Sequence, residues 1–271
     1  MAIAFPKAKI NIGLYITEKR TDGYHNLCSC FYPIPFYDVL EILPAPNYSL
    51  HISGLNVPGA PEDNLCTKAF RLMQQKHGID EVAIYLHKHI PMGAGLGGGS
   101  SDAAATLKLL NELFDLKLPT AILKEYAAAL GSDCAFFIEE QAAICTGRGE
   151  ICHPLPLSLY GYHLVVVYPE LHISTANAYR HIQPAPVGYD LERFLCTHEP
   201  EAWGTVVVNR FEDYVLELYP DLALLKKQLY EAGACYASMS GSGSAFYGIF
   251  KKPLTDYQWS YPTWQFAIQN D

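Results

Sequence analysis

Apolar and polar residues alternate along several stretches of this chain with the period of two that is typical of β-strands. In residues 3–16, the aliphatic side chains from Ala8 to Ile16 fall on one face, whereas Lys9 and Asn11 fall on the other. Polar residues at alternate positions of a strand most often face solvent. Further strands are predicted at residues 39–43, 50–53, 82–87, 162–168 and 259–268.

Other stretches repeat their apolar residues with the spacing of an α-helix. One such run lies between Asn64 and Gly78, and a second lies between Thr120 and Gly131. Glycine is the residue most favoured just after a helix, so both runs have a predicted end. Further helices are predicted from Ser174-Thr175 to about His181 and at residues 191–203, 206–218 and 221–232.

Residues 91–105, P-M-G-A-G-L-G-G-G-S-S-D-A-A-A, join a predicted strand to a predicted helix through a glycine-rich loop. Ser100, Ser101 or Asp102 would cap this helix, since Ser and Asp are common at that position. Glycine lets a backbone approach a ligand closely, and the first N–H groups of a helix attract anions. We therefore predict a phosphate-binding loop, although its spacing matches neither the P-loop nor the dinucleotide fingerprint. The alternative is a plain turn, which needs fewer glycines.

The composition restricts the classes of protein to which the chain can belong. Of its 271 residues, 50% are hydrophobic and 17% are charged, as expected for a globular protein with a large core. The formal net charge of −9 argues against binding to nucleic acids or anionic membranes. No apolar run approaches the ~18 residues of a membrane span. The N-terminus, broken early by Pro6 and Lys7, does not resemble a signal peptide, so we expect a cytoplasmic protein.

The 8 cysteines indicate neither a zinc site nor a disulfide framework. They are scattered, no C-x-x-C occurs, and Cys28 and Cys30 form the only close pair. Several lie in apolar runs, where cysteine behaves as a small hydrophobic residue. This usage fits a reducing compartment.

Two more stretches carry candidate chemistry. Asp133 follows the predicted helix end at Gly131 and precedes an apolar run; taken alone, it would more often cap the next turn. A second glycine-rich loop, Ser240-Gly-Ser-Gly243, is flanked by strand-like runs. Because the pattern changes near residues 150–160, we predict two lobes, each of which supplies one glycine-rich loop to a shared cleft.

Four motifs taken together resemble the GHMP kinase superfamily and, within it, the family of 4-diphosphocytidyl-2-C-methyl-D-erythritol kinases. Residues 6–12 resemble the P-A-K-x-N opening, 20–25 the R-x-D-G-Y-H turn, 91–105 the ATP phosphate loop and 240–243 the third motif. The second motif is the most discriminating. The resemblance implies a two-lobed α+β fold, with an N-terminal ATP-binding lobe at 1–153, a C-terminal substrate lobe at 154–271 and the active site in the cleft between them.

The resemblance also implies roles for individual residues. Asp133 lies where the family has its catalytic Asp, and Lys9 lies where the family has the partner Lys. Residues 132–135 depart from the usual A-D-[IV]-[PF], which alters the packing behind Asp133 but keeps its carboxylate. The substrate-binding residues would be Asn11, Tyr24, His25, Thr175 and Tyr179, with Tyr24 and His25 at the cytosine end.

ATP and Mg²⁺ are the cofactors that the resemblance implies. No protein ligand for Mg²⁺ is obvious, and Ser100 or Ser101 is the best candidate. ATP would be held by Asn64, Lys88, Pro91, Met92, Gly93, Ala94, Gly95, Leu96, Gly97, Gly98, Gly99, Ser100 and Ser101.

These roles predict ATP-dependent phosphorylation of the 2-hydroxyl of 4-diphosphocytidyl-2-C-methyl-D-erythritol, a step of the non-mevalonate isoprenoid route. Asp133 would accept the proton of the attacking hydroxyl, and Lys9 would stabilise the transferred phosphoryl group. The alternatives are another small-molecule kinase of the superfamily, such as a mevalonate or homoserine kinase, and a non-catalytic nucleotide-binding protein of the same fold. The partner would be a small-molecule substrate, and the chain would be a monomer or a homodimer.

Overall fold

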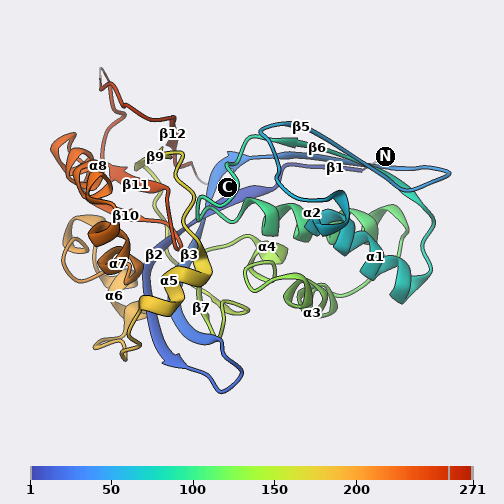
Figure 1. Cartoon of the computed structure of the whole chain (residues 1–271), viewed down its shortest axis with the longest axis horizontal. Coiled ribbons are helices and arrows are strands. Elements are labelled where there is room, and N and C mark those ends of the chain that lie inside the picture. Colours follow the sequence, from blue (N-terminus) through green and yellow to red (C-terminus); the bar gives the residue numbers. More distant parts are fainter. Residues whose placement is uncertain (1, 256, 270–271) are drawn as a thin grey trace. The chain divides into compact units, whose positions relative to one another are not determined.

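The computed structural model describes residues 2–255 and 257–269, which form a mixture of helices and sheets (Figure 1). By its internal contacts, the chain divides into two compact units. The first unit contains the segment that ends at Ala8, together with Phe36–Met92 and Gly97–Gln141. The second contains Lys9–Pro35, Gly93–Leu96 and the chain from Ala142 onward. Each unit consists of several separate segments of the chain, so its bounds differ from those of the lobes predicted at 1–153 and 154–271. The division into these two domains stays a prediction.

The first unit contains a four-stranded sheet with the order β1-β4-β6-β5. Strand β4 pairs antiparallel with β1 and β6, whereas β5 pairs parallel with β6. In β6, Ile84, Leu86 and Lys88 are buried, and Tyr85 and His87 face the more open side. The strand bounds are β1 (Ala2–Ala4), β4 (Val39–Pro44), β5 (Ser49–Gly54) and β6 (Val82–Lys88).

Helices cover one face of this sheet (Figure 1). They are α1 (Leu65–His77), α2 (Gly98–Leu113), α3 (Thr120–Leu130) and α4 (Phe136–Glu139), preceded by a 3₁₀ turn at Pro61–Asp63. Helix α2 is central, because it packs against the other three helices and against β1 and β4. Asn64 caps α1 by accepting a hydrogen bond from the Cys66 N–H at 2.8 Å, and Gly78 ends the helix at φ 64°. Gly131 also follows a helix, but its φ of −177° is extended backbone.

The second unit contains two four-stranded sheets, of order β2-β3-β7-β8 and β10-β11-β9-β12. Helix α7 packs against α5 and α8, and α8 packs against β10 and β11. Leu14, Val165, Phe211 and Phe246 belong to the buried hydrophobic cluster of this unit. Its strands are β2 (Lys7–Lys19) from Lys9 onward, β3 (His25–Tyr37) as far as Pro35, β7 (Ala143–Thr146), β8 (Ile151–Pro154), β9 (His163–Val167), β10 (Tyr236–Met239), β11 (Phe246–Phe250) and β12 (Thr263–Ala267). Its helices are α5 (Thr175–His181), α6 (Leu191–Thr197), α7 (Phe211–Leu218), α8 (Pro220–Glu231) and a 3₁₀ turn at Pro200–Ala202.

Three sequence predictions differ from this fold. The helix predicted at 191–203 ends at Thr197, because Pro200 starts a separate 3₁₀ turn. The helix predicted at 206–218 begins at Phe211. The expectation that Lys9 and Asn11 face solvent is wrong: they are 2% and 1% exposed, since β2 is buried on both faces from Ala8 to Ile16.

A disulfide joins Cys145 and Cys152, which are register partners in the antiparallel β7–β8 pair. The expectation that the cysteines form no disulfide is therefore wrong for this pair, because only the hairpin register brings the two side chains together. The other cysteines, Cys28 and Cys30 included, are free thiols. In the ranges that the structure describes, no helix is long and apolar enough to cross a membrane.

Candidate active site

The glycine-rich stretch leads directly into helix α2, which begins at Gly98 after an N-cap at Gly97 with φ 75°. Among the described residues, no side chain caps this helix, so the predicted capping by Ser100, Ser101 or Asp102 is wrong. The first helical hydrogen bond runs from the Ser101 N–H to the Gly97 carbonyl at 3.0 Å. The N–H groups of Gly98, Gly99 and Ser100 therefore have no acceptor within the helix and can bind an anion.

Lys88, the last residue of β6, is buried between two carboxylates. Its Nζ pairs with Asp38 and, at 2.7 Å, with Oδ2 of Asp102. Asp38 Oδ1 also accepts hydrogen bonds from the N–H groups of His89 at 2.6 Å and Ile90 at 2.9 Å. Asp38 thus fixes the backbone that enters the phosphate loop. Asp38 was not among the residues predicted from the sequence, although an acidic residue among the apolar positions of 36–42 was a usable signal.

Burial and neighbouring charges shift the pKa values of Lys88 and Asp102. Burial raises the pKa of Asp102 to about 7, with Asp38 adding to the rise and Lys88 opposing it. Burial alone would lower the pKa of Lys88, but Asp102 and Asp38 outweigh it and the pKa is raised. Lys88 therefore stays charged, and Asp102 titrates near neutral pH. Asp102 Oδ1 is buried without a hydrogen-bond partner in the described part of the chain.

A cavity of about 370 Å³ lies in the first unit beside the start of α2. Its wall is largely apolar with a few polar groups, as is common in small-molecule sites, and includes Asn64, Lys88, Met92, Gly99 and Asp102. The cavity thus gathers residues that were predicted to bind a nucleotide. Because the Asn64 side-chain oxygen already accepts the Cys66 N–H, the amide nitrogen is the part of Asn64 suited to a ligand.

Asp133 lies in the turn between α3 and α4, half-buried and in the same unit as α2. It does not cap α4: the N-cap is Ala135, and no side chain within the described ranges caps that helix. Burial raises the pKa of the neighbouring Cys134 to about 12; a hydrogen bond with Ser100 lowers it and the charge of Asp133 raises it. The hydrogen bond with Ser100 places Cys134, and with it the adjacent Asp133, near the first turn of α2.

Lys9 and Asn11 occupy the interior of the second unit. The Lys9 N–H donates to the Leu96 carbonyl at 2.9 Å, and its Nζ donates to Asn11 Oδ1 at 2.5 Å. Asn11 Nδ2 donates to Ser29 Oγ at 2.9 Å, and Asn11 Oδ1 accepts the Gly241 N–H at 2.9 Å. Asn11 thus joins β2, β3 and the second glycine-rich loop, a structural role that the predicted substrate contact did not include.

The second glycine-rich loop packs closely on residues 93–96 of the phosphate loop. Ser240 Oγ donates to the Gly95 carbonyl at 2.8 Å, and the Ala245 N–H donates to the Ala94 carbonyl at 3.1 Å. Gly95 has φ +80°, and a Cβ there would lie 2.0 Å from the Ser240 carbonyl oxygen. Only glycine fits this position without displacing backbone.

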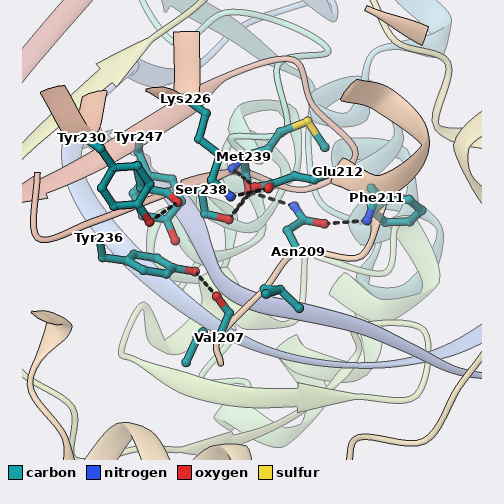
Figure 2. A network of polar contacts seen from close by, with 12 residues as sticks. Val207, Asn209, Phe211, Glu212, Lys226, Tyr230, Tyr236, Ser238, Met239 and Tyr247 are labelled. Carbon is teal, nitrogen blue, oxygen red and sulfur yellow. Dashed lines mark hydrogen bonds and ion pairs between the residues drawn. The ribbon is translucent and has the colours of Figure 1, made fainter. Parts of the chain in front are cut away.

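Figure 2 shows a buried polar network that connects Asn209 and Glu212 with Ser238 and Met239, the residues just before the second loop. Asn209 Nδ2 donates to the carbonyls of Met239 and Gly241, each at 2.8 Å. Glu212 Oε1 accepts hydrogen bonds from Ser238 Oγ at 2.9 Å and from the Met239 N–H at 2.7 Å. Asn209 and Glu212 were not predicted from the sequence, because their partners lie some 30 residues away in the chain.

The predicted cytosine-end residues lie on and beside the turn between β2 and β3. His25 stacks on Tyr179 with 5.2 Å between ring centroids, and Arg148 lies 5.0 Å from the centroid of Tyr24, which is 56% exposed. Burial, helped by Lys19, lowers the pKa of His25, so its ring is neutral at pH 7. Thr175 begins α5, and its hydroxyl lies 2.8 Å from Ser242 Oγ.

The predicted site residues fall into two groups, one in each unit. The first unit contains Asn64, Lys88, Pro91, Met92, Gly97, Gly98, Gly99, Ser100, Ser101 and Asp133. The second contains Lys9, Asn11, Tyr24, His25, Gly93, Ala94, Gly95, Leu96, Thr175 and Tyr179. The pairing of Lys9 with Asp133 stays a prediction.

Comparisons with known proteins identify the family to which the chain belongs. The model for the GHMP kinases N-terminal domain matches residues 64–141, and the model for the GHMP kinases C-terminal domain matches residues 193–256. A 4-diphosphocytidyl-2-C-methyl-D-erythritol kinase of Bacteroides fragilis is 51% identical over 252 residues, 92% of each chain. One of Bacteroides thetaiotaomicron is 48% identical over 263 residues, which cover 94% of this chain and 96% of the relative. A crystal structure of a 4-(cytidine 5'-diphospho)-2C-methyl-D-erythritol kinase matches with a TM-score of 0.77 and 32% identity, covering 92% of this chain and 90% of that chain.

Proposed function

This chain belongs to the GHMP kinases and, within them, to the 4-diphosphocytidyl-2-C-methyl-D-erythritol kinases, and we propose that it transfers the terminal phosphoryl group of ATP to the 2-hydroxyl of that substrate. It is a small-molecule kinase, and its product enters isoprenoid precursor synthesis. The mevalonate and homoserine kinase alternatives have no support from relatives of comparable identity.

The uncapped start of α2 carries this proposal. Its first N–H groups lack intrahelical acceptors, and a cavity of about 370 Å³ opens beside them. The triphosphate of ATP would bind at the helix start, where the dipole and the N–H groups favour negative charge. The adenosine part would occupy the cavity against Asn64, Lys88 and Met92.

Asp133 and Lys9 would perform the transfer itself. Phosphoryl transfer depends mostly on positioning and on neutralisation of charge. Asp133, near the helix start, would accept the proton of the attacking 2-hydroxyl. Lys9, whose Nζ donates to Asn11 Oδ1 at 2.5 Å, would stabilise the negative charge of the phosphoryl group during its transfer.

Mg²⁺ would be held mainly by the phosphates of ATP. The described residues contain no cluster of three or more His, Cys, Asp or Glu side chains that could hold a metal ion. Ser101 Oγ, by contrast, is a buried hydroxyl oxygen without a partner among these residues, and it suits a hard cation. When bound, Mg²⁺ would neutralise phosphate charge, and the chain would need to supply few ligands.

The cytidine end of the substrate would contact Tyr24, His25 and Tyr179. Aromatic rings that are already stacked lose little freedom when a base binds against them, and a neutral His25 can donate or accept hydrogen bonds. A monomeric or homodimeric state and a cytoplasmic location complete the proposal.

A coupled ADP-release assay with Mg-ATP tests the function. The acceptors would be 4-diphosphocytidyl-2-C-methyl-D-erythritol, mevalonate, homoserine and a no-acceptor control. We expect turnover with the cytidyl substrate alone. Turnover with another alcohol would support the kinase activity but show that the substrate is a different one. No ADP release above the control would favour a non-catalytic nucleotide-binding protein.

A further inference from the structure

Two histidines project from the open face of the first unit's sheet at the end of β6. His87 and His89 flank Lys88, and because side chains alternate along a strand, Lys88 points to the buried face and both histidines point to the other. Their Nε2 atoms lie 3.1 Å apart, and their rings meet edge to face at 85°. The phosphoryl-transfer residues described above do not include either histidine.

The second nitrogen of each ring is held by an oxygen. His87 Nδ1 lies 2.7 Å from Ser53 Oγ, and Ser53 is the register partner of His87 on β5. His89 Nδ1 lies 3.3 Å from the Tyr37 carbonyl oxygen. A carbonyl can only accept, so His89 carries its proton on Nδ1 and presents a lone pair at Nε2.

The distance between the two Nε2 atoms suits a shared metal ion. Imidazole nitrogens bind Zn²⁺ at about 2.0–2.1 Å, so two of them on one ion stand roughly 3 Å apart. Metal-binding histidines usually donate their other N–H to an oxygen, which fixes the tautomer and the ring orientation. Ser53 and the Tyr37 carbonyl are placed to do this for His87 and His89.

We propose that His87 and His89 form a binding site for a divalent transition-metal ion of the Zn²⁺, Ni²⁺ or Cu²⁺ class. Imidazole nitrogen suits these ions and not Mg²⁺, which prefers oxygen. Since the described residues bring no third His, Cys, Asp or Glu to the pair, water completes the coordination shell. The site binds reversibly and is separate from any Mg²⁺ on ATP.

The competing arrangement is a plain hydrogen-bonded chain. In it, the Ser53 hydroxyl donates to His87 Nδ1, and the His87 Nε2–H donates to His89 Nε2. Metal binding moves the His87 proton from Nε2 to Nδ1, and the Nδ1–H then donates a hydrogen bond to Ser53 Oγ, so neither ring changes its charge. The two arrangements therefore differ in whether an ion binds, and a titration separates them.

The test is isothermal titration of the tag-free full chain with ZnCl₂ in the absence of nucleotide. Variants are His87→Ala, His89→Ala and Ser53→Ala, with His51→Ala as the matched control. His51 lies on the same sheet, where it stacks on Tyr85 at 4.7 Å. We expect wild type and His51→Ala to bind one ion at this site equally well. Loss of either ligand should abolish that binding, and Ser53→Ala should weaken it by about tenfold.

A Cu²⁺ electron paramagnetic resonance spectrum gives a second measurement. Two nitrogen ligands should appear in wild type and in His51→Ala, and this two-nitrogen signal should be absent from His87→Ala and from His89→Ala. Unchanged thermal unfolding would show that the variants fold. No Zn²⁺ binding by folded wild type, or equal binding in wild type and His87→Ala, would overturn the proposal in favour of the hydrogen-bonded chain.

Discussion

Burial determines how single polar residues behave in the candidate site. Lys9, Asn11, Lys88 and Asp102 are all at most 3% exposed, so each depends on hydrogen bonds or opposite charge inside the protein. Asn11 meets this need with Lys9, Ser29 and Gly241. The same side chains that would contact ligands therefore also hold the site in shape.

The role of Asp133 predicts a loss of turnover with little loss of binding. Asp133→Asn keeps the shape of the side chain but cannot accept the hydroxyl proton, so kcat should fall by about 10²–10⁴-fold with the KM for ATP little changed. Steady-state ADP release measures both constants. Glu139→Gln, an exposed change in the nearby α4, is the control and should leave kcat unaltered. A kcat near wild type in Asp133→Asn would remove Asp133 from the mechanism.

Asp102 predicts a pH dependence of stability. Its folded pKa of about 7 lies above its ordinary value of 3.8, so between these values the folded chain keeps a proton that the unfolded chain has released. Its contribution to the free energy of unfolding is full below pH 3.8 and is lost as pH rises through about 7. The asparagine side chain of Asp102→Asn is uncharged at every one of these pH values, so its contribution to the free energy of unfolding does not fall as pH rises.

Chemical denaturation at pH 5 and pH 8 tests this prediction. The free energy of unfolding of Asp102→Asn, relative to wild type, should be higher at pH 8 than at pH 5. Asp80→Asn, at an exposed position, should show no such change. A relative stability of Asp102→Asn that is the same at both pH values would mean that the carboxyl of Asp102 is ionised throughout.

At the scale of elements, residues 93–96 of the phosphate loop and the second glycine-rich loop pack together in the second unit. Gly95 and Gly161 both have positive φ, of +80° and +85°, but a Cβ on Gly161 would meet no described atom within 4 Å. Gly161→Ala should therefore cost only the backbone strain, about 1–2 kcal/mol. Gly95→Ala adds a collision with the Ser240 carbonyl, so it should cost more and should also lower kcat.

Urea denaturation and ADP release measure these two effects. Because both variants make the same change at nearly the same φ, their difference isolates the contact between the loops. Equal free energies of unfolding for the two variants would contradict the close packing of Gly95 on Ser240.

Whole-molecule stability should respond to the nucleotide. A ligand that binds only the folded chain at about 100 times its Kd stabilises it by about 2.7 kcal/mol, so a non-hydrolysable ATP analogue with Mg²⁺ should raise the Tm of wild type and Asp133→Asn alike. Gly99→Val should abolish the rise, because its side chain would project from the cavity wall beside Met92 and Leu65. Differential scanning fluorimetry measures the shift. A full shift in folded Gly99→Val would place the nucleotide elsewhere.

Local chemistry determined what the sequence could predict by itself. The helices 65–77, 120–130 and 175–181 and the strand before the phosphate loop depend on neighbouring residues, and all were predicted closely. The glycine-rich loop and the motif that contains Tyr24 and His25 were likewise sufficient to indicate the family, because their residues are close together in the chain.

Tertiary structure decided what depends on partners far along the chain. Four features of the site and its surroundings form only after strands and loops have paired. They are the burial of Lys9, the ion pair of Asp38 with Lys88, the hydrogen bonds of Asn209 to the second loop and the Cys145–Cys152 disulfide. The same holds for the facing Nε2 atoms of His87 and His89, whose rings are oriented by Ser53 and Tyr37 from other segments. A sequence pattern specifies which side of a strand a residue faces, and only the folded chain specifies what it meets there.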